Sequence, residues 1–305
     1  MIGLPLVSIS CLTYNHAQYL RECFDGILMQ KTNFDFEVVV HDDASTDETK
    51  AIIEEYTNKF PDIFFPMYQE ENQYSKGVRG VMGKFNFPRC RGKYIAMCEG
   101  DDYWTDENKL QKQVDFLENN PDYSICWTNY VELDNTKNNK IFKTPDWNNS
   151  IDATQNHSFD LNSIFTPYCT FTLTTLLRKS ALDMSLLLSL KNAKDNTYYS
   201  ICLTKGKGML LNFKSAVYRV HDGGIYSKVS VFKQRYYSYL NIKEIVEKVP
   251  GCDNQNFRLI RDTLFFKSIK YFPSQFDREY WHLIMDSYKI YGVKKTLKFI
   301  KSRYK

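Results

Sequence analysis

Two pairs of adjacent aspartates, Asp42-Asp43 and Asp101-Asp102, each follow directly on a run of apolar residues that reads as a strand. In an open α/β sheet, ligands bind in the crevice outside the carboxyl ends of the strands, so we expect both pairs to face one crevice. Adjacent carboxylates stay ionised more readily when a cation or a hydrogen-bond donor lies between them. One or two carboxylates suffice to hold Mg²⁺ or Mn²⁺ against substrate phosphates. The pairs therefore indicate a divalent metal or a nucleoside, although Asp-rich turns are also common for purely structural reasons.

The elements that must position these pairs alternate between strand and helix from Leu6 to about Tyr130, which is typical of βαβ units. Strands are expected at 6–12, 36–41, 63–68, 94–98, 171–177 and 209–220, a helix at about 197–204, and helices from Val231 onward. The fold class predicted is α/β, with a doubly wound, mostly parallel sheet flanked by helices and a C-terminal helical extension. We expect three regions: residues 1–130, residues 131–228, and a helical region at 229–305.

The composition excludes several classes of protein. The 305 residues are 43% hydrophobic and 25% charged, as in ordinary globular proteins. A net charge of +4 is too small for a dedicated nucleic-acid binder. The eight cysteines include no C-x-x-C pair, which favours a reduced, cytoplasmic setting over a zinc or redox site. No apolar run approaches the ~18 residues of a membrane span, and the first twelve residues do not resemble a signal peptide.

Three blocks lie within the first 130 residues: Val7-Ser-Ile-Ser-Cys-Leu-Thr-Tyr-Asn15, Glu37-Val-Val-Val-His-Asp-Asp-Ala-Ser-Thr-Asp47, and Glu99-Gly-Asp-Asp-Tyr-Trp-Thr-Asp106 with Lys109-Leu110 after it. In order and spacing they resemble the inverting, nucleotide-sugar-dependent family 2 glycosyltransferases of the GT-A fold. The resemblance implies that residues 1–130 bind the nucleotide sugar and that residues 131–228 bind the acceptor. Beyond the three blocks, Lys194-Asp195-Asn196 and Tyr218-Arg-Val-His221 look like the family's later acidic position and its Arg-x-His segment.

The resemblance implies a role for several residues of these blocks. The turn that contains Leu12, Thr13 and Asn15, together with the carboxylate of Asp43, would hold the nucleotide; Asn15 is also a plausible N-cap of the helix that follows. Asp101 would approach the ribose or the diphosphate. Asp102 would hold Mn²⁺ or Mg²⁺, a Lewis acid that stabilises the charge gathered by the leaving diphosphate. The family motif often begins with Asp where this chain has Glu99, so no ligand role is assigned to Glu99.

Asp195 is the candidate catalytic base. In an inverting transfer, a carboxylate takes the proton of the acceptor hydroxyl as that oxygen attacks the anomeric carbon. Asp195 also precedes a helical stretch and could be its N-cap, and the two roles are compatible. By resemblance, His221 is a metal or diphosphate contact, because a neutral imidazole suits ions of the manganese class. The alternative for His221 is an exposed histidine in the turn that Asp222-Gly223-Gly224 would form.

Three further residues are candidates for phosphate or sugar contacts. Arg79 lies in a polar, glycine-containing stretch, 69–83, predicted to be a flexible surface loop. Arg219 could pair bidentately with phosphate, although an arginine on a strand more often forms a surface ion pair. Trp104 could stack on a sugar ring, although a tryptophan beside a buried strand more often belongs to the core.

The C-terminal stretch 292–305 places apolar residues on one helical stripe among lysines and arginine; the stripe is Val293, Leu297, Ile300 and Tyr304. Such a helix either docks on anionic lipid at the inner face of the membrane or packs on the domain. The function predicted is metal-dependent, inverting transfer of one sugar from a nucleotide donor, a UDP-sugar, to a glycan or lipid-linked saccharide acceptor in bacterial surface polysaccharide synthesis. The alternative is a non-catalytic sugar-nucleotide-binding scaffold, and no nucleic-acid partner is expected.

Overall fold

The computed structural model describes residues 3–136, 140–145, 150–152, 154–224, 229–271 and 278–303. The strands are β1 (Val7–Thr13), β2 (Phe36–Asp42), β3 (Phe64–Tyr68), β4 (Tyr94–Glu99), β5 (Tyr103–Trp104), β6 (Tyr123–Asp134), β7 (Ile141–Lys143), β8 (His157–Phe159), β9 (Leu176–Arg178) and β10 (Lys207–Val220). The α-helices are α1 (Ala17–Leu28), α2 (Thr49–Lys59), α3 (Lys109–Asn119), α4 (Met184–Ser189), α5 (Asp195–Leu203), α7 (Val231–Lys248), α8 (Gln255–Lys270) and α9 (Arg278–Arg303).

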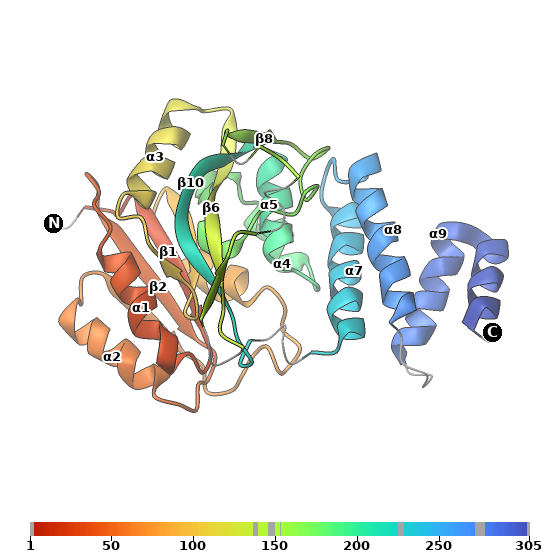
Figure 1. Cartoon of the computed structure of the whole chain (residues 1–305), viewed down its shortest axis with the longest axis horizontal. Coiled ribbons are helices and arrows are strands. Elements are labelled where there is room, and N and C mark those ends of the chain that lie inside the picture. Colours follow the sequence, from red (N-terminus) through yellow and green to blue (C-terminus); the bar gives the residue numbers. More distant parts are fainter. Residues whose placement is uncertain are drawn as a thin grey trace.

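Within the described residues the strands form one sheet in the order β3-β2-β1-β4-β9-β6-β10-β5, with β7 beside β6 and β8 beside β10. Figure 1 labels β1, β2, β6, β8 and β10 of this sheet. The long pairings of β1 with β2 and β4, of β2 with β3 and of β6 with β10 are parallel, whereas the short ones are antiparallel. The predicted α/β class with a mostly parallel sheet flanked by helices is confirmed. Strand β6 crosses residue 130, and the three-region division stays a prediction.

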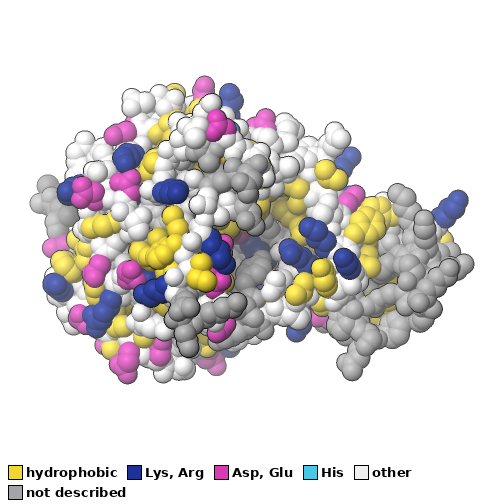
Figure 2. All heavy atoms as spheres, viewed as in Figure 1, with side chains coloured by type: hydrophobic (Ala, Val, Ile, Leu, Met, Phe, Trp, Pro, Cys, Tyr) yellow, Lys and Arg dark blue, Asp and Glu magenta, His cyan; other side chains and the backbone are white. Residues whose placement is uncertain are grey.

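The parallel strands are buried on both faces, which is why β2 reads as the continuous apolar run Val38-Val-Val40 rather than an alternating pattern. Helix α1 covers one face through the stripe of Leu20, Phe24 and Ile27. On the face shown in Figure 2, acidic and basic side chains are interspersed over the sheet domain, as the small net charge suggests.

Two segments differ from the sequence prediction. The strand expected at 171–177 forms only at Leu176–Arg178, because the hydroxyls of Thr174 and Thr175 donate to the carbonyl of Phe171 (2.7 and 3.0 Å) and close a 3₁₀ turn there. The loop expected at 69–83 ends in a π-helical turn, Met82–Asn86. Short polar side chains that bond to nearby backbone compete with strand formation, which an apolar pattern does not register.

The C-terminal helices α7, α8 and α9 form the extension at the right of Figure 1. Helix α7 is tied to the domain by Asn241, whose Nδ2 donates to Thr197 Oγ1 (2.8 Å), and by Glu244, whose carboxylate accepts the amides of Lys191 and Asn192 (3.0 and 2.7 Å). The extension also has its own buried cluster: Phe232, Tyr236, Tyr239, Phe265, Tyr280 and Leu283.

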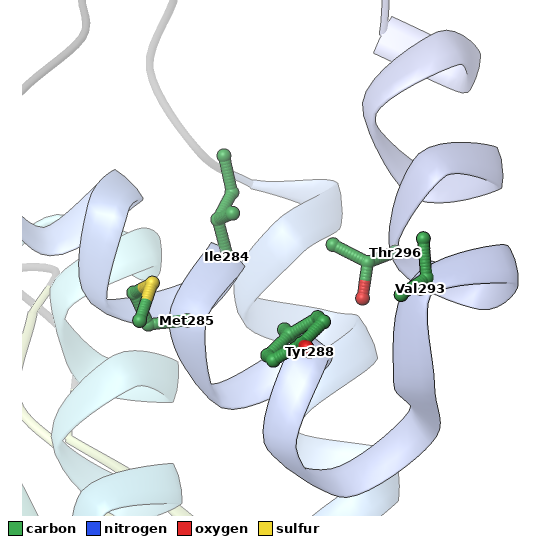
Figure 3. A pocket seen from close by; sticks show the side chains of 5 residues that line it. All are labelled: Ile284, Met285, Tyr288, Val293 and Thr296. Carbon is green, nitrogen blue, oxygen red and sulfur yellow. The ribbon is translucent and has the colours of Figure 1, made fainter.

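Helix α9 reverses at Gly292, whose φ of 77° lies in the left-handed region that favours glycine. Its two arms enclose an apolar groove of about 350 Å³, lined by Ile284, Met285, Tyr288, Val293 and Thr296 (Figure 3). Of the apolar stripe predicted for the tail, Val293 is exposed, while the side chains of Leu297 and Ile300 and all of Tyr304 lie outside the described residues. Within the described part of the chain, no helix has the length and apolar character needed to cross a membrane.

Candidate functional site

The end of β1 holds both acidic turns in place. The carbonyl of Leu12 accepts the amide of Gly100 (2.9 Å), and the carbonyl of Thr13 accepts the amide of Asp43 (2.9 Å). The parallel registers Thr13↔Asp42 and Leu12↔Glu99 bring the carboxyl ends of β2 and β4 to either side of that of β1. The structure therefore brings the two aspartate pairs to one edge of the sheet.

The carboxylates of Glu99, Asp101 and Asp102 form an acidic cluster after β4, with ligand oxygens all within 4.8 Å of one another. Asp102 is 1% exposed, and its Oδ1 accepts the amide of Arg219 (2.8 Å). Burial, and then the charges of Asp101 and Glu99, raise the pKa of Asp102 well above its usual range. Burial, and then Asp101 and Asp195, likewise raise the pKa of Glu99 to about 8. Three carboxylates this close favour a shared proton or a cation.

Asp101 lies between two histidines. Its Oδ2 is 3.1 Å from His221 Nε2 and 3.5 Å from His16 Nε2. Burial opposes ionisation of Asp101, but His16 and His221 outweigh it and lower the pKa of this carboxyl below its usual value. Burial lowers the pKa of His16 itself, against the opposing effect of the Asp101 charge. An ionised carboxylate with two imidazoles beside it is a donor set suited to Mn²⁺-class ions.

His16 is a site residue that the sequence analysis missed. Asn15 was the predicted N-cap of α1, but the cap residue is His16, and its side chain makes no capping bond. Asn15 has a φ of 55° and its Oδ1 accepts the amide of Thr46 (2.8 Å), which ties the turn after β1 to the turn after β2. The turn between β1 and α1 thereby directs the His16 ring to Asp101, a residue far from it in sequence.

Arg219 is buried within the protein and braces the acidic turn. Its guanidinium stacks over the rings of Tyr19 (4.9 Å) and Tyr103 (4.4 Å), donates to the carbonyl of Asp101 (2.6 Å), and pairs with Glu22. These contacts use the N–H donors of the guanidinium that a bidentate bond to phosphate would need. The ion pair that was the alternative does form, with Glu22, but only the Glu22 end of it lies at the surface, because the Arg219 side chain is 3% exposed.

We expect Arg219→Met and Arg219→Lys each to lower the free energy of unfolding by about 2 kcal/mol, because neither side chain can make the stacked, forked set of bonds. Urea unfolding measures this. Arg258→Met removes an exposed pair with Asp253 and should stay within about 0.5 kcal/mol of the unmodified chain. Unchanged stability of Arg219→Lys would contradict the bracing role.

Asp43 pins the loop that was predicted to be flexible. Its Oδ1 accepts the amide of Gln73 (2.8 Å) and its Oδ2 the amide of Tyr74 (3.1 Å). Burial acts against ionisation of Asp43, but His41, whose Nε2 lies 3.6 Å from Asp43 Oδ1, and these two amides lower its pKa. In the same loop, the Arg79 guanidinium lies between the rings of Tyr74 (4.4 Å) and Tyr237 of α7 (5.1 Å). Arg79 therefore holds the loop against α7 by packing on both rings.

Trp104 belongs to the core. Its ring is 1% exposed, its Nε1 donates to the carbonyl of Leu173 (2.9 Å), and the ammonium of Lys109 lies 4.3 Å from the ring centre. The candidate sugar contact at Trp104 is therefore wrong, and the core alternative holds. A ring that is closed off by β10 and α3 cannot present a face to a sugar.

Asp195 is the first residue of α5, directly after the N-cap residue Lys194. The amide of Lys194 donates to Thr197 Oγ1 (3.1 Å), while Asp195 Oδ1 accepts the neighbouring amide of Asn196 (2.9 Å). The hydroxyl of Tyr168 donates to Asp195 Oδ2 (3.2 Å). Burial raises the pKa of Asp195. The negative charge of Asp195 in turn raises the pKa of Glu99, so Asp195 and the acidic cluster interact electrostatically.

The family model described as "Glycosyl transferase family 2" matches residues 8–182, more than half of the chain. The chain belongs to glycosyltransferase family 2. An uncharacterised Mycobacterium tuberculosis protein is 43% identical over 123 residues, 40% of this chain and 34% of the relative. This family member therefore spans about a third of the length of the mycobacterial relatives that it matches.

Two further proteins are similar over most of this family member. The Escherichia coli UDP-Glc:alpha-D-GlcNAc-diphosphoundecaprenol beta-1,3-glucosyltransferase WfaP is 26% identical over 223 residues, 73% of this chain and 80% of the relative. The structure of the Pyrobaculum calidifontis mannosyltransferase PcManGT, in complex with GDP-Man and Mn²⁺, superposes with a TM-score of 0.61 at 14% identity, covering 99% of this chain and 80% of the other. At 14% identity, the likeness to PcManGT bears on the fold alone.

The acidic cluster suits the divalent ion that the family uses. Carboxylate oxygens are the preferred ligands of Mg²⁺ and Mn²⁺, and a nearby imidazole favours Mn²⁺. Asp101 is the more accessible aspartate of its pair, with a side chain that is 20% exposed, whereas Asp102 is buried. The residues present therefore fit such an ion.

Proposed function

We propose that this family member transfers one sugar, with inversion, from a UDP-sugar to a hydroxyl of a glycan or lipid-linked saccharide. The observation that carries the proposal is the acidic cluster of Glu99, Asp101 and Asp102, flanked by His221, within electrostatic reach of Asp195. Such a cluster suits a nucleoside diphosphate with its ion, and a separate carboxylate suits an acceptor hydroxyl.

In this mechanism Asp101, Asp102 and His221 would hold Mn²⁺ or Mg²⁺, which would supply positive charge against the leaving diphosphate. Asp101 takes the more exposed position of the two aspartates, and Asp102, bonded to the Arg219 amide, fixes the turn. Asp195 accepts the proton of the acceptor hydroxyl as the new glycosidic bond forms and the bond between sugar and diphosphate breaks. Its raised pKa makes it a stronger base than an ordinary aspartate.

The nucleotide is proposed to bind over the end of β1, against Leu12, Thr13, Asn15 and Asp43. Both Asp43 oxygens accept loop amides, so a base that bonds to Asp43 must share or displace Gln73 and Tyr74. We expect that exchange to move the loop and to change the packing of the Arg79 guanidinium on the Tyr237 ring of α7. The class of the acceptor and the identity of the metal ion are likewise proposals.

The proposed role is bacterial surface polysaccharide synthesis at the inner face of the membrane. WfaP, by its name, acts on a diphosphoundecaprenol-linked sugar. In this chain, the exposed Trp281, Met285 and Tyr288 on α9 would suit contact with such a membrane. A non-catalytic scaffold is the second candidate, and donor turnover separates the two.

Thermal unfolding with UDP tests the proposal. At about 100 times the dissociation constant, UDP should add about 2.7 kcal/mol and raise the midpoint by roughly 5 to 10 °C. The shift should require Mn²⁺ and be absent with CMP. Release of UDP from UDP-glucose or UDP-N-acetylglucosamine then shows turnover. A nucleotide-dependent shift without turnover would favour the scaffold, and no shift with UDP or GDP would contradict both candidates.

A further inference from the structure

Three aromatic side chains, which we call the aromatic wall, lie in a row beside the site: Tyr168, Phe171 and Tyr218. The ring centres of Tyr168 and Phe171 are 5.6 Å apart at 77°, and those of Phe171 and Tyr218 are 5.3 Å apart at 61°. Tyr130 supports Phe171 from a ring distance of 4.6 Å. The edge-to-face packing fixes the wall as a rigid surface.

The aromatic wall extends from Asp195 at one end to the acidic cluster at the other. At one end, the Tyr168 hydroxyl is 3.2 Å from Asp195 Oδ2. At the other end, Tyr218 immediately precedes Arg219, whose amide donates to Asp102 Oδ1 (2.8 Å). A molecule lying along the wall would reach from the acidic cluster to Asp195.

The exposed part of the wall is centred on Tyr168, which is 42% exposed although its ring packs on Phe165 and Phe171. Pyranose rings present C–H faces to aromatic rings and hydroxyls to carboxylates, and an aromatic ring with a carboxylate beside it offers both partners. Resting on the function proposed above, we propose that the aromatic wall is the acceptor subsite, where a pyranose ring stacks on Tyr168 with one hydroxyl directed at Asp195.

The Tyr168 hydroxyl also suits Asp195 in both of its protonation states. It carries one proton, and it lies 3.2 Å from Asp195 Oδ2 and 3.1 Å from Asn196 Oδ1. While Asp195 is ionised, the hydroxyl donates to it. Once Asp195 has taken the acceptor proton, the hydroxyl can donate to Asn196 and accept from Asp195 instead. The subsite thus holds the sugar and orients the base through one side chain.

Saturation-transfer NMR with simple sugars tests the subsite. The probes are methyl α-D-glucopyranoside and methyl N-acetyl-β-D-glucosaminide, with the open-chain alditol sorbitol as control, all in the presence of UDP and Mn²⁺. The unmodified chain and Tyr168→Phe should bind the pyranosides within about twofold of each other, because both keep the ring face. Tyr168→Ala and Tyr168→Leu should bind at least one pyranoside about tenfold more weakly, and Tyr168→Leu retains the apolar contact with Phe165 and Phe171.

The outcomes separate this inference from the function on which it rests. The subsite is overturned if no pyranoside receives saturation in the unmodified chain, if Tyr168→Ala and Tyr168→Leu bind as well as that chain, or if Tyr168→Phe loses as much as they do. In each case a normal UDP and Mn²⁺ thermal shift in the same variant shows that it is folded and that the donor proposal stands. Absence of that shift from the unmodified chain rejects the donor proposal instead.

Discussion

Replacing Asp101 with asparagine is expected to lower donor turnover about 10³-fold and to abolish the stabilisation that Mn²⁺ adds to UDP binding. An asparagine side chain has the same shape without the negative charge, and only the ionised carboxylate balances a cation beside the two imidazoles of His16 and His221. A ligand set that stabilises several kcal/mol of leaving-group charge corresponds to about three powers of ten in rate. Thermal shift with UDP, with and without Mn²⁺, and UDP release from UDP-glucose measure the two effects.

Asp106→Asn is the matched control for that change. Asp106 lies five residues further along the same segment and forms an ion pair with the half-exposed Lys112 (2.6 Å), so its loss should leave turnover within about twofold. An Asp101→Asn variant that keeps the Mn²⁺-dependent shift would remove Asp101 from the ion site and leave Asp102 and Glu99 as its carboxylates.

Replacing Asp195 with asparagine is expected to leave the UDP and Mn²⁺ shift intact and to lower turnover about 10²- to 10⁴-fold, the range of general-base catalysis. An asparagine oxygen can still accept the Asn196 amide, so the start of α5 should persist. The lost property is the ability to take a proton. The thermal shift and the initial rate of UDP release, measured on the same sample, separate binding from chemistry.

The pH dependence of turnover is a second test of Asp195 as the base. A base works only when it is ionised, so turnover falls as the pH drops through the pKa of the group. Because burial raises the pKa of Asp195, the fall should begin above the usual aspartate range and vanish in Asp195→Asn. Asp183→Asn is the control, since Asp183 caps α4 through the Leu186 amide and asparagine caps a helix equally well. Full turnover in Asp195→Asn would exclude it as the base.

The candidate site was predictable where it follows from local pattern. An apolar run that ends in two aspartates predicts a buried parallel strand with carboxylates at its end, and strands of one sheet bring such ends together. Asp43, Asp101 and Asp102 were found in this way. The contacts of these carboxylates were predictable only in part. The Arg-x-His segment pointed to Arg219 and His221 but not to the bond from Arg219 to the Asp101 carbonyl, and His16 is distant from Asp101 in sequence and carries no spacing signal.

The α/β class, the acidic turns at the ends of the parallel strands and the resemblance to the family could be predicted from the chain alone, since they depend on hydrophobic period and on residues adjacent in the chain. Which groups are accessible follows from how the elements pack. Packing against β10 buries Trp104 and Asp102, Arg219 of β10 is itself buried, and Asp101 is left more open, while Tyr168 reaches Asp195 from 27 residues away. Burial and long-range contact are properties of packed elements, and a linear pattern records neither.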